Sequence, residues 1–389
     1  MPGQASPVYL DHNAGAPMRP AVRDAVIEVL QDAGNASSVH AHGRKARGRI
    51  ENAREQVAKL CGAFTRAVTF VSGGTEANMT ALSPSWQDQG EPVYLDKLFR
   101  SAVEHPSVVT GGRFRVADQV VIPVDSNGVI DLEALEDRVS DADPSLISVM
   151  AANNETGVIQ PLEGVGAIAA KYGHFFHVDA VQAAGRMPIN MGLWQADAVT
   201  LSAHKFGGPQ GIGAVVVRST ARVPSPLMVG GGQENWRRGG TENVSAIAGF
   251  GVAASAALED LNKIDQMKMM KARLETGLVN TCPSLTIFGA DAERLVNTTC
   301  FAVPGISAET ALIALDLERV SLSSGSACSS GKVSVSHVLS AMGVEEDTAR
   351  CALRISMGWN TEDADIDRFL DVWPRVVDRL NPDARHRAA

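Results

Sequence analysis

The chain has 389 residues, of which 45% are hydrophobic and 20% charged, and its formal net charge is −9 at pH 7. This length predicts two or three domains with enough apolar residues to form a core without disulfide bonds. The negative charge argues against a protein that binds nucleic-acid phosphates through a basic stripe.

The N-terminal stretch, Met1 to Ser6, has neither the basic nor the apolar run of a signal peptide. The longest weakly polar run, 244–258, is rich in Ala and Gly and short for a membrane span, which favours an internal helix. The five cysteines form no C-x-x-C pair, so we expect neither a disulfide framework nor a metal site. A reducing cytoplasm is the expected setting.

Short apolar runs alternate with helix-like segments through the first two thirds of the chain. Strands are expected at 68–71, 146–150, 174–178, 198–201 and 213–217. This alternation predicts βαβ units, and therefore an α/β fold with a mostly parallel sheet that is buried on both faces.

The pattern changes near Asn262, where a charged helix begins that we expect to run from Lys263 to about Val279. Shorter strand and helix signals follow. The predicted organisation is a large α/β domain at 16–260 and a smaller α+β domain built from 1–15 and 261–389.

Two segments that follow predicted strands favour ligand binding. The turn Ser72, Gly73, Gly74 and Thr75 lets backbone amides approach an anion such as a phosphate, although an ordinary strand-to-helix turn explains it equally well. Asp179 ends a predicted buried strand, where open α/β sheets bind ligands. Its carboxylate would need a partner such as a protonated pyridine nitrogen, or it would serve only as a helix cap.

Lys205 follows another predicted strand, inside a glycine-rich turn and flanked by Ser202 and His204. A lone lysine in a loop is usually exposed to solvent, but a buried lysine has a depressed pKa and forms Schiff bases readily. Pyridoxal 5′-phosphate requires a Schiff-base lysine, an acid that faces the ring nitrogen and a phosphate site. The combination of Lys205, Asp179 and the Gly74–Thr75 turn therefore predicts this cofactor.

From Tyr9 to about Gly358 the chain resembles the cysteine desulfurases of the NifS/IscS type, in the class-V aminotransferase family of fold-type-I enzymes. The segments that carry the resemblance are SGGTEAN (72–78), VEHPSV (103–108), NNETGV (153–158), HVDAVQAAG (177–185), SAHKFGGPQGIG (202–213), GGGQENWRRGGTENV (230–244), SSGSACSSG (323–331) and LRISMG (353–358). The resemblance implies a large domain with a mostly parallel seven-stranded sheet and a smaller α+β C-terminal domain.

The resemblance also implies roles for the residues that hold the cofactor. Lys205 is expected to form the Schiff base, Asp179 to face the pyridine nitrogen, and Gln182 to donate to the ring O3′. His105 is expected to stack on the ring and to move protons, although an ordinary loop histidine is the alternative. The expected phosphate ligands are Gly74, Thr75, Ser202, His204 and, from a second subunit, Thr241.

Asn154 and Arg354 match the groups that lie beside the cofactor and the substrate carboxylate. Arginine suits this task because its planar guanidinium binds a carboxylate with two hydrogen bonds. The alternative for Arg354 is a surface ion pair.

Cys328 matches the nucleophile that becomes a persulfide in this family. The small residues around it could equally form a flexible linker with an incidental thiol. The other cysteines, in apolar or ordinary surroundings, are expected to be packing residues: Cys61, Cys282, Cys300 and Cys351.

The implied reaction converts L-cysteine to L-alanine and leaves a persulfide on Cys328. A homodimer and a sulfur acceptor, such as an iron–sulfur scaffold protein of the NifU/IscU type, are the implied partners, with no nucleic acid and no membrane. The alternatives are a selenocysteine lyase or an aminotransferase of the same fold and, from another class, a non-catalytic sulfur carrier or scaffold-binding protein.

Three positions depart from the family pattern. Gly15 and Ala16 replace two threonines after Asn13 and Ala14, which puts any polar role of that turn in doubt. Met79 stands where a second asparagine is common, and the segment 234–236 (Glu, Asn, Trp) lacks the more usual Arg-Gly. We expect none of these changes to abolish cofactor binding.

Overall fold

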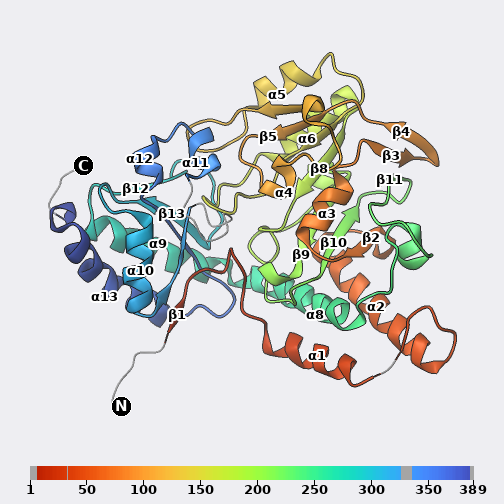
Figure 1. Cartoon of the computed structure of the whole chain (residues 1–389), viewed down its shortest axis with the longest axis horizontal. Helices are drawn as coiled ribbons and strands as arrows, with labels where there is room; N and C mark the ends of the chain where they lie inside the picture. Colours follow the sequence, from red (N-terminus) through yellow and green to blue (C-terminus); the bar gives the residue numbers. More distant parts are fainter. Residues whose placement is uncertain (1–6, 33, 326–334, 386–389) are drawn as a thin grey trace.

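Two lobes lie side by side in the computed structural model, which describes residues 7–32, 34–325 and 335–385 (Figure 1). The larger lobe is built around a seven-stranded sheet and the smaller lobe around a four-stranded one. A separate three-stranded sheet lies in the larger lobe, in the order β11 (Arg222–Pro224), β3 (Ser85–Asp88) and β4 (Glu91–Tyr94).

The large sheet is mostly parallel, as the sequence predicts. Its strand order is β2 (Val68–Val71), β10 (Gly213–Val217), β9 (Ala198–Ser202), β8 (Phe175–Asp179), β7 (Leu146–Ser148), β5 (Leu98–Ser101) and β6 (Gln119–Ile122). Only β10 runs antiparallel to its neighbours, β2 and β9. The five strands expected from the sequence all form, with ends that shift by at most two residues.

The strands at the centre of this sheet are covered on both faces. Every residue of β2, β7, β8, β9 and β10 is buried, which explains why these segments are continuous apolar runs rather than alternating ones. Because β8 and β9 are parallel neighbours, with Asp179 opposite Thr200, their carboxyl ends bring Asp179 and Ser202 to one edge.

The helices of the larger lobe connect these strands and cover the sheet. They are α1 (Pro20–Leu30), α2 (Ala41–Leu60), α3 (Gly74–Ala81), α4 (Pro106–Val109), α5 (Leu132–Val139), α6 (Leu162–Tyr172), α7 (Met191–Trp194) and α8 (Val244–Asp260). The α3 helix packs on β9 and β10, so the turn before it opens onto the edge that carries Asp179 and Ser202.

The smaller lobe has an antiparallel sheet in the order β12 (Thr286–Ile287), β13 (Thr298–Ala302), β16 (Ala352–Ser356) and β15 (Ser323–Ser324). Its helices are α9 (Ile264–Thr281), α10 (Ala308–Leu317), α11 (His337–Ala341), α12 (Glu346–Ala349) and α13 (Asp363–Leu380). The N-terminal strand β1 (Val8–Tyr9) pairs with β14 (Val320–Ser321), and Asp11 bridges to Ser356.

Separate hydrophobic cores underlie the two lobes. One draws on residues between Val22 and Ala257, and another on Val8, Leu10 and residues between Met270 and Ala384. A third, smaller cluster joins Val103 to residues between Phe288 and Ala352. On this basis we propose the division expected from the sequence, with a large domain at 16–260 and a small one at 1–15 and 261–389.

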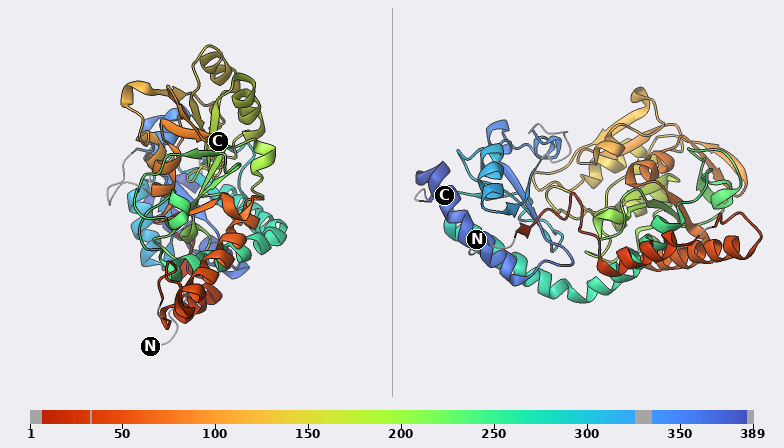
Figure 2. Two further views of the ribbon diagram at one scale, coloured as in Figure 1. Left: turned by 90° about the vertical axis from the view of Figure 1, so that its right-hand side faces the viewer. Right: turned by 60° about the horizontal axis from the view of Figure 1, so that its bottom comes forward.

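A long helical segment, Val244–Thr281, is the one helix in the described part of the chain that is long and apolar enough to cross a membrane. It consists of α8, a short 3₁₀ turn at Leu261–Lys263 and α9, and Figure 2 shows it running along one side of both lobes. Its α8 part packs against α1 and α2, and its α9 part packs against α13. It is therefore a core helix of the fold, as the Ala- and Gly-rich sequence at 244–258 predicts.

Candidate active site

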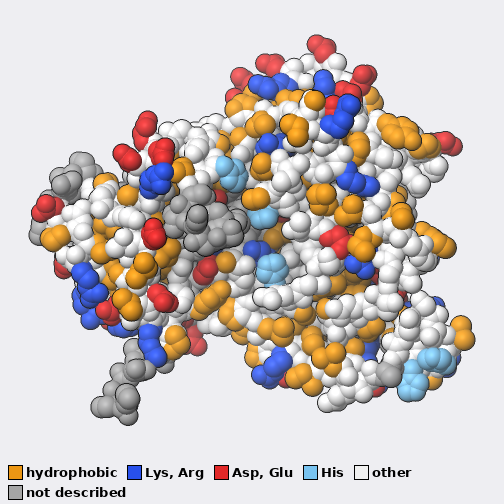
Figure 3. All heavy atoms as spheres, viewed as in Figure 1, with side chains coloured by type: hydrophobic (Ala, Val, Ile, Leu, Met, Phe, Trp, Pro, Cys, Tyr) orange, Lys and Arg blue, Asp and Glu red, His pale blue; other side chains and the backbone are white. Residues whose placement is uncertain are grey.

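A cavity of about 280 Å³ lies at the carboxyl edge of β8 and β9. It brings together ten of the residues that the sequence singles out: Gly74, Thr75, His105, Asn154, Asp179, Gln182, Ser202, His204, Lys205 and Arg354. Figure 3 shows histidine and basic side chains around the hollow in the middle of this face of the molecule. Residues more than 250 positions apart thus share one site, because the N-terminal segment and β16 reach it from the smaller lobe.

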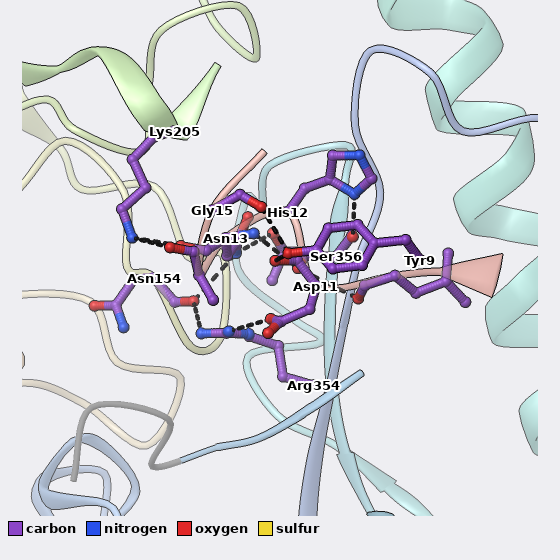
Figure 4. A network of polar contacts seen from close by, with 12 residues as sticks. Tyr9, Asp11, His12, Asn13, Gly15, Asn154, Lys205, Arg354 and Ser356 are labelled. Atoms are coloured by element: carbon purple, nitrogen blue, oxygen red, sulfur yellow. Dashed lines mark hydrogen bonds and ion pairs between the residues drawn. The ribbon is translucent and has the colours of Figure 1, made fainter. Parts of the chain in front are cut away.

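Lys205 extends into the cavity from a 3₁₀ turn, Ala203–Lys205, that directly follows β9. Its Nζ donates hydrogen bonds to the backbone oxygens of Asn13, at 2.7 Å, and of Ala14, at 3.0 Å (Figure 4). Neutral carbonyl oxygens of the N-terminal segment therefore hold the amine in place.

Asp179 is the last residue of β8 and is 5% exposed. Its Oδ2 accepts from Asn78 Nδ2 at 2.7 Å, and its Oδ1 accepts from the backbone N–H of Val181 at 3.0 Å. Among the described residues, no basic side chain forms an ion pair with this carboxylate. A buried carboxylate with two neutral donors still lacks an opposite charge, which a protonated pyridine nitrogen would supply.

His105 caps the short helix α4 and lines the same cavity. Its Nδ1 accepts from the backbone N–H of Ser107 at 3.2 Å and lies 2.8 Å from the Ser107 hydroxyl. Burial lowers the pKa of His105, and the charge of Asp179 opposes that shift. A neutral imidazole with Nδ1 as acceptor carries its proton on Nε2.

The four expected phosphate ligands of this chain lie beside one another. A Cβ atom on Gly74 would lie 3.3 Å from Ser202 Cβ, so the turn before α3 approaches the end of β9 closely. The hydroxyl of Ser202 is 2.9 Å from His204 Nδ1, and Thr75 follows Gly74 in the first turn of α3. Burial and the nearby Lys205 lower the pKa of His204 to about 4, so this imidazole is neutral at pH 7.

Arg354 reaches the cavity from β16 and is 1% exposed, which excludes the surface ion pair considered above. Its Nη2 donates to Asp11 Oδ1 at 2.7 Å, and its Nη1 donates to the backbone oxygen of Asn154 at 3.0 Å (Figure 4). Its Nε is buried and has no hydrogen-bond partner among the described residues. A buried donor that lacks an acceptor fits a site for an anionic ligand group.

Several side-chain contacts that support the site were not predicted from the sequence. Asn78 joins Asp179 to the Ser107 hydroxyl, at 2.9 Å, and accepts from Thr200. Asp11 neutralises Arg354, and Gln182 Nε2 donates to Asn13 O at 3.1 Å. In the sequence, only their place in the matching segments pointed to Asn78 and Asp11. Contacts between side chains that are distant in the chain cannot be read from one sequence.

Two of the three departures from the family pattern have structural explanations, and nothing in the structure explains Met79. The oxygen of Gly15 accepts from the Tyr9 hydroxyl at 2.7 Å, and the N–H of Ala16 donates to the oxygen of His204 at 2.8 Å. Backbone groups and Tyr9 therefore hold this turn without the two missing hydroxyls. Glu234 is buried, and its carboxylate binds both terminal nitrogens of Arg54 at 2.7 Å, so it anchors the loop that precedes Thr241.

Thr241 and Cys328 are the two remaining expected site residues. Thr241 lines a neighbouring pocket with Ser72 and Arg238, which agrees with its expected role in a second subunit but does not test it. Cys328 lies outside the described residues. The other four cysteines are buried in the hydrophobic cores, as expected of packing residues: Cys61, Cys282, Cys300 and Cys351.

The comparisons with known proteins agree with this geometry. The model of the aminotransferase class-V family matches residues 8–369. A cysteine desulfurase of Sinorhizobium fredii is 40% identical over 382 residues, which cover 96% of this chain and 97% of that protein. The chain belongs to the cysteine desulfurases of the class-V aminotransferase family.

Further relatives support the assignment. An IscS-like cysteine desulfurase of Mycobacterium tuberculosis is 37% identical, over 95% of this chain and 96% of its own length. The crystal structure of a NifS-like protein from Rickettsia africae superimposes with a TM-score of 0.84 at 34% identity, and covers 96% of this chain and 100% of that one.

Membership of the family implies dependence on pyridoxal 5′-phosphate and L-cysteine as the substrate. The cavity fits this cofactor, since no Lys or Arg of the described residues forms an ion pair with Asp179 and the amine of Lys205 meets neutral oxygens. Within residues 7–32, 34–325 and 335–385, no group of three or more His, Cys, Asp or Glu side chains could hold a metal ion.

Proposed function

We propose that Lys205 holds pyridoxal 5′-phosphate as a Schiff base and that Cys328 takes the sulfur of L-cysteine as a persulfide. The observation that carries the proposal is the single cavity shared by Lys205, Asp179 and Arg354. Gly74, Thr75, Ser202 and His204 would bind the phosphate, and Gln182 would donate to the ring oxygen.

The bound cofactor would withdraw electrons from the substrate Cα. Arg354 would bind the substrate carboxylate through its unpartnered Nε and its terminal nitrogens, with Asn154 beside it. The amine of Lys205, once displaced, would take the Cα proton. His105, a neutral imidazole above the same cavity, would move protons to and from the substrate.

The Cys328 thiolate would form an S–S bond to the substrate sulfur while the bond between that sulfur and Cβ breaks. Alanine is then the carbon product, and the sulfur stays on Cys328. Burial of the other four cysteines supports this choice, since it raises the pKa of Cys61 to about 12 and that of Cys300 well above its ordinary value. A thiol that stays protonated is a poor nucleophile.

We further propose that the enzyme is a cytoplasmic homodimer in which Thr241 binds the phosphate in the partner's site. The position of Thr241 in a pocket apart from Lys205 supports this arrangement. The sulfur would pass to an acceptor such as an iron–sulfur scaffold protein of the NifU/IscU type.

Two variants test the proposal. Cys328→Ala should keep the visible absorbance of the bound cofactor and lose sulfide and alanine production by about 10³-fold or more, because the nucleophile is removed. Lys205→Ala should lose the visible absorbance as well as activity. Cys351→Ala is the matched control and should turn over at the wild-type rate. Wild-type turnover by Cys328→Ala would refute the assignment of the nucleophile.

A further inference from the structure

Arg186 lies in the turn that follows β8, contacts Gln182 of the active-site cavity, and is 8% exposed. Its Nη1 donates to both the backbone oxygen, at 3.2 Å, and the side-chain Oε1 of Gln182. Its Nη2 donates to the backbone oxygens of Lys205, at 3.0 Å, and of His12, at 3.4 Å. One guanidinium therefore joins the turn that carries Gln182, the turn that carries Lys205 and the N-terminal segment.

The charge of Arg186 faces only neutral oxygens within the described part of the chain. Burial lowers the pKa of Arg186 to about 9, so the guanidinium is still charged at neutral pH. Placing a cation in the interior without a carboxylate is costly, and the cost is reduced only by well-placed acceptors. By contrast, the neighbouring Arg354 is paired with Asp11.

The contact with Arg186 decides which way the amide of Gln182 faces. A guanidinium has only donors, so the atom that it contacts must be the amide oxygen. The NH₂ group then lies on the other side, where Nε2 donates one hydrogen to Asn13 O at 3.1 Å. Since Gln182 lines the cavity, its second N–H is left for a ligand oxygen.

We propose that Arg186 is a positioning residue for the cofactor, because it fixes the amide of Gln182 with its N–H toward the ring oxygen. This inference rests on the proposed function. A donor held toward that oxygen stabilises its anionic form, and the charge of Arg186, one side chain away, acts in the same direction.

The experiment compares Arg186→Met with wild type in a pH titration of the visible absorbance of the bound cofactor. Loss of the held donor should raise the pH midpoint by about one unit and weaken cofactor affinity about tenfold. Arg113→Met is the matched control. Arg113 is also partly buried and donates to the backbone oxygens of Pro226, Thr80 and Ser225, away from the cavity. It should leave both quantities unchanged.

A double variant separates positioning from a general loss of stability. In a Gln182→Met background, adding Arg186→Met should shift the midpoint by much less, since there is no amide left to orient. If Arg186→Met does not fold, Arg186→Lys should shift the midpoint in the same direction by a smaller amount.

The inference is wrong if the Arg186 variants titrate like wild type, or if their effect is equally large without Gln182. Wild-type protein that gains no visible absorbance with pyridoxal 5′-phosphate would instead overturn the proposed function, and the inference with it.

Discussion

At the scale of single residues, the three charged side chains of the site have different hydrogen-bond and ion-pair partners. Asp179 meets two neutral donors, Lys205 meets two carbonyl oxygens, and Arg354 is paired with Asp11. A charged ligand can complete a buried carboxylate that meets only neutral donors, whereas a paired arginine is held in place before the substrate arrives. This arrangement fits a ligand that carries anionic groups and a cationic ring.

Glu155 is a buried carboxyl group close to this site. It is 5% exposed, its Oε2 accepts from the Ser336 hydroxyl, and a Cβ atom on Gly325 would lie 3.6 Å from the same oxygen. Burial raises the pKa of Glu155 from 4.5 to about 7, against the opposing effects of Ser336 and Arg354. The folded state therefore prefers its protonated form.

We predict that Glu155→Gln stabilises the protein at pH 8 and not at pH 4. Because the folded pKa lies above the unfolded one, the wild-type free energy of unfolding falls as the pH rises from 4.5 to 7. The loss is at most about 3 kcal/mol. Thermal unfolding of the variant and of wild type at both pH values measures the difference in stability, and Glu133→Gln, at an exposed position, is the control. A variant that is not more stable than wild type at pH 8 would contradict the shift.

At the scale of secondary-structure elements, the packed helices α2 and α8 each contain a glycine, and the two glycines are expected to have opposite effects on stability. Gly251 lies in α8, where a Cβ atom would come within 2.6 Å of Ala53 Cα in α2. Gly48 lies in α2 itself, exposed, with nothing within 4 Å of a Cβ. Of these two positions, only 251 requires glycine for α8 to approach α2.

Alanine at these two positions should change stability in opposite directions. Gly251→Ala should lower the free energy of unfolding by about 1–3 kcal/mol, because the two backbones must separate. Gly48→Ala should raise it by up to about 1 kcal/mol, because alanine is the better helix former. Chemical denaturation measures both, and equal effects would show that the helices do not pack as described.

At the scale of the whole molecule, the candidate active site lies between the two lobes and draws residues from both. Asp179 and Lys205 come from the large sheet, whereas Asp11 and Arg354 come from the N-terminal segment and β16 of the smaller lobe. A change in the relative position of the lobes would therefore alter the spacing between the proposed Schiff-base lysine and the proposed carboxylate-binding arginine.

In the proposed dimer, each active site also needs a residue from the partner chain. If Thr241 serves the partner's site, dimers formed between Lys205→Ala and Thr241→Val chains contain one wild-type site, since each chain supplies what the other lacks. Dimers between a Lys205→Ala, Thr241→Val double variant and wild-type chains contain none. Mixed dimers of the first kind should show about half the wild-type turnover per dimer. Higher turnover in the second mixture would place Thr241 in its own chain's site, and equal turnover would show that Thr241 serves neither site.

The large sheet could be predicted from the sequence because buried parallel strands need continuous apolar runs, and 213–217 gives β10 to the residue. The direction of β10 could not be predicted, since an antiparallel strand on the same buried sheet has the same composition. Lys205, Asp179 and the turn at Gly74 were recognisable because each follows a strand and carries a residue type that the cofactor chemistry requires.

Five strands of the large sheet, the family with the cofactor dependence that it implies, and the residues of the candidate site could thus be predicted from the sequence alone, since these predictions depend on local patterns and residue chemistry. Which groups face each other was decided only by the tertiary structure. Asn78 meets Asp179, Asp11 meets Arg354, and Arg186 meets Gln182. Two of these contacts join segments about 100 or more positions apart, and the third depends on a side-chain orientation set by the surrounding fold. The physical reason is that hydrogen-bond partners are chosen by distance and direction in space, which no periodicity along the chain records.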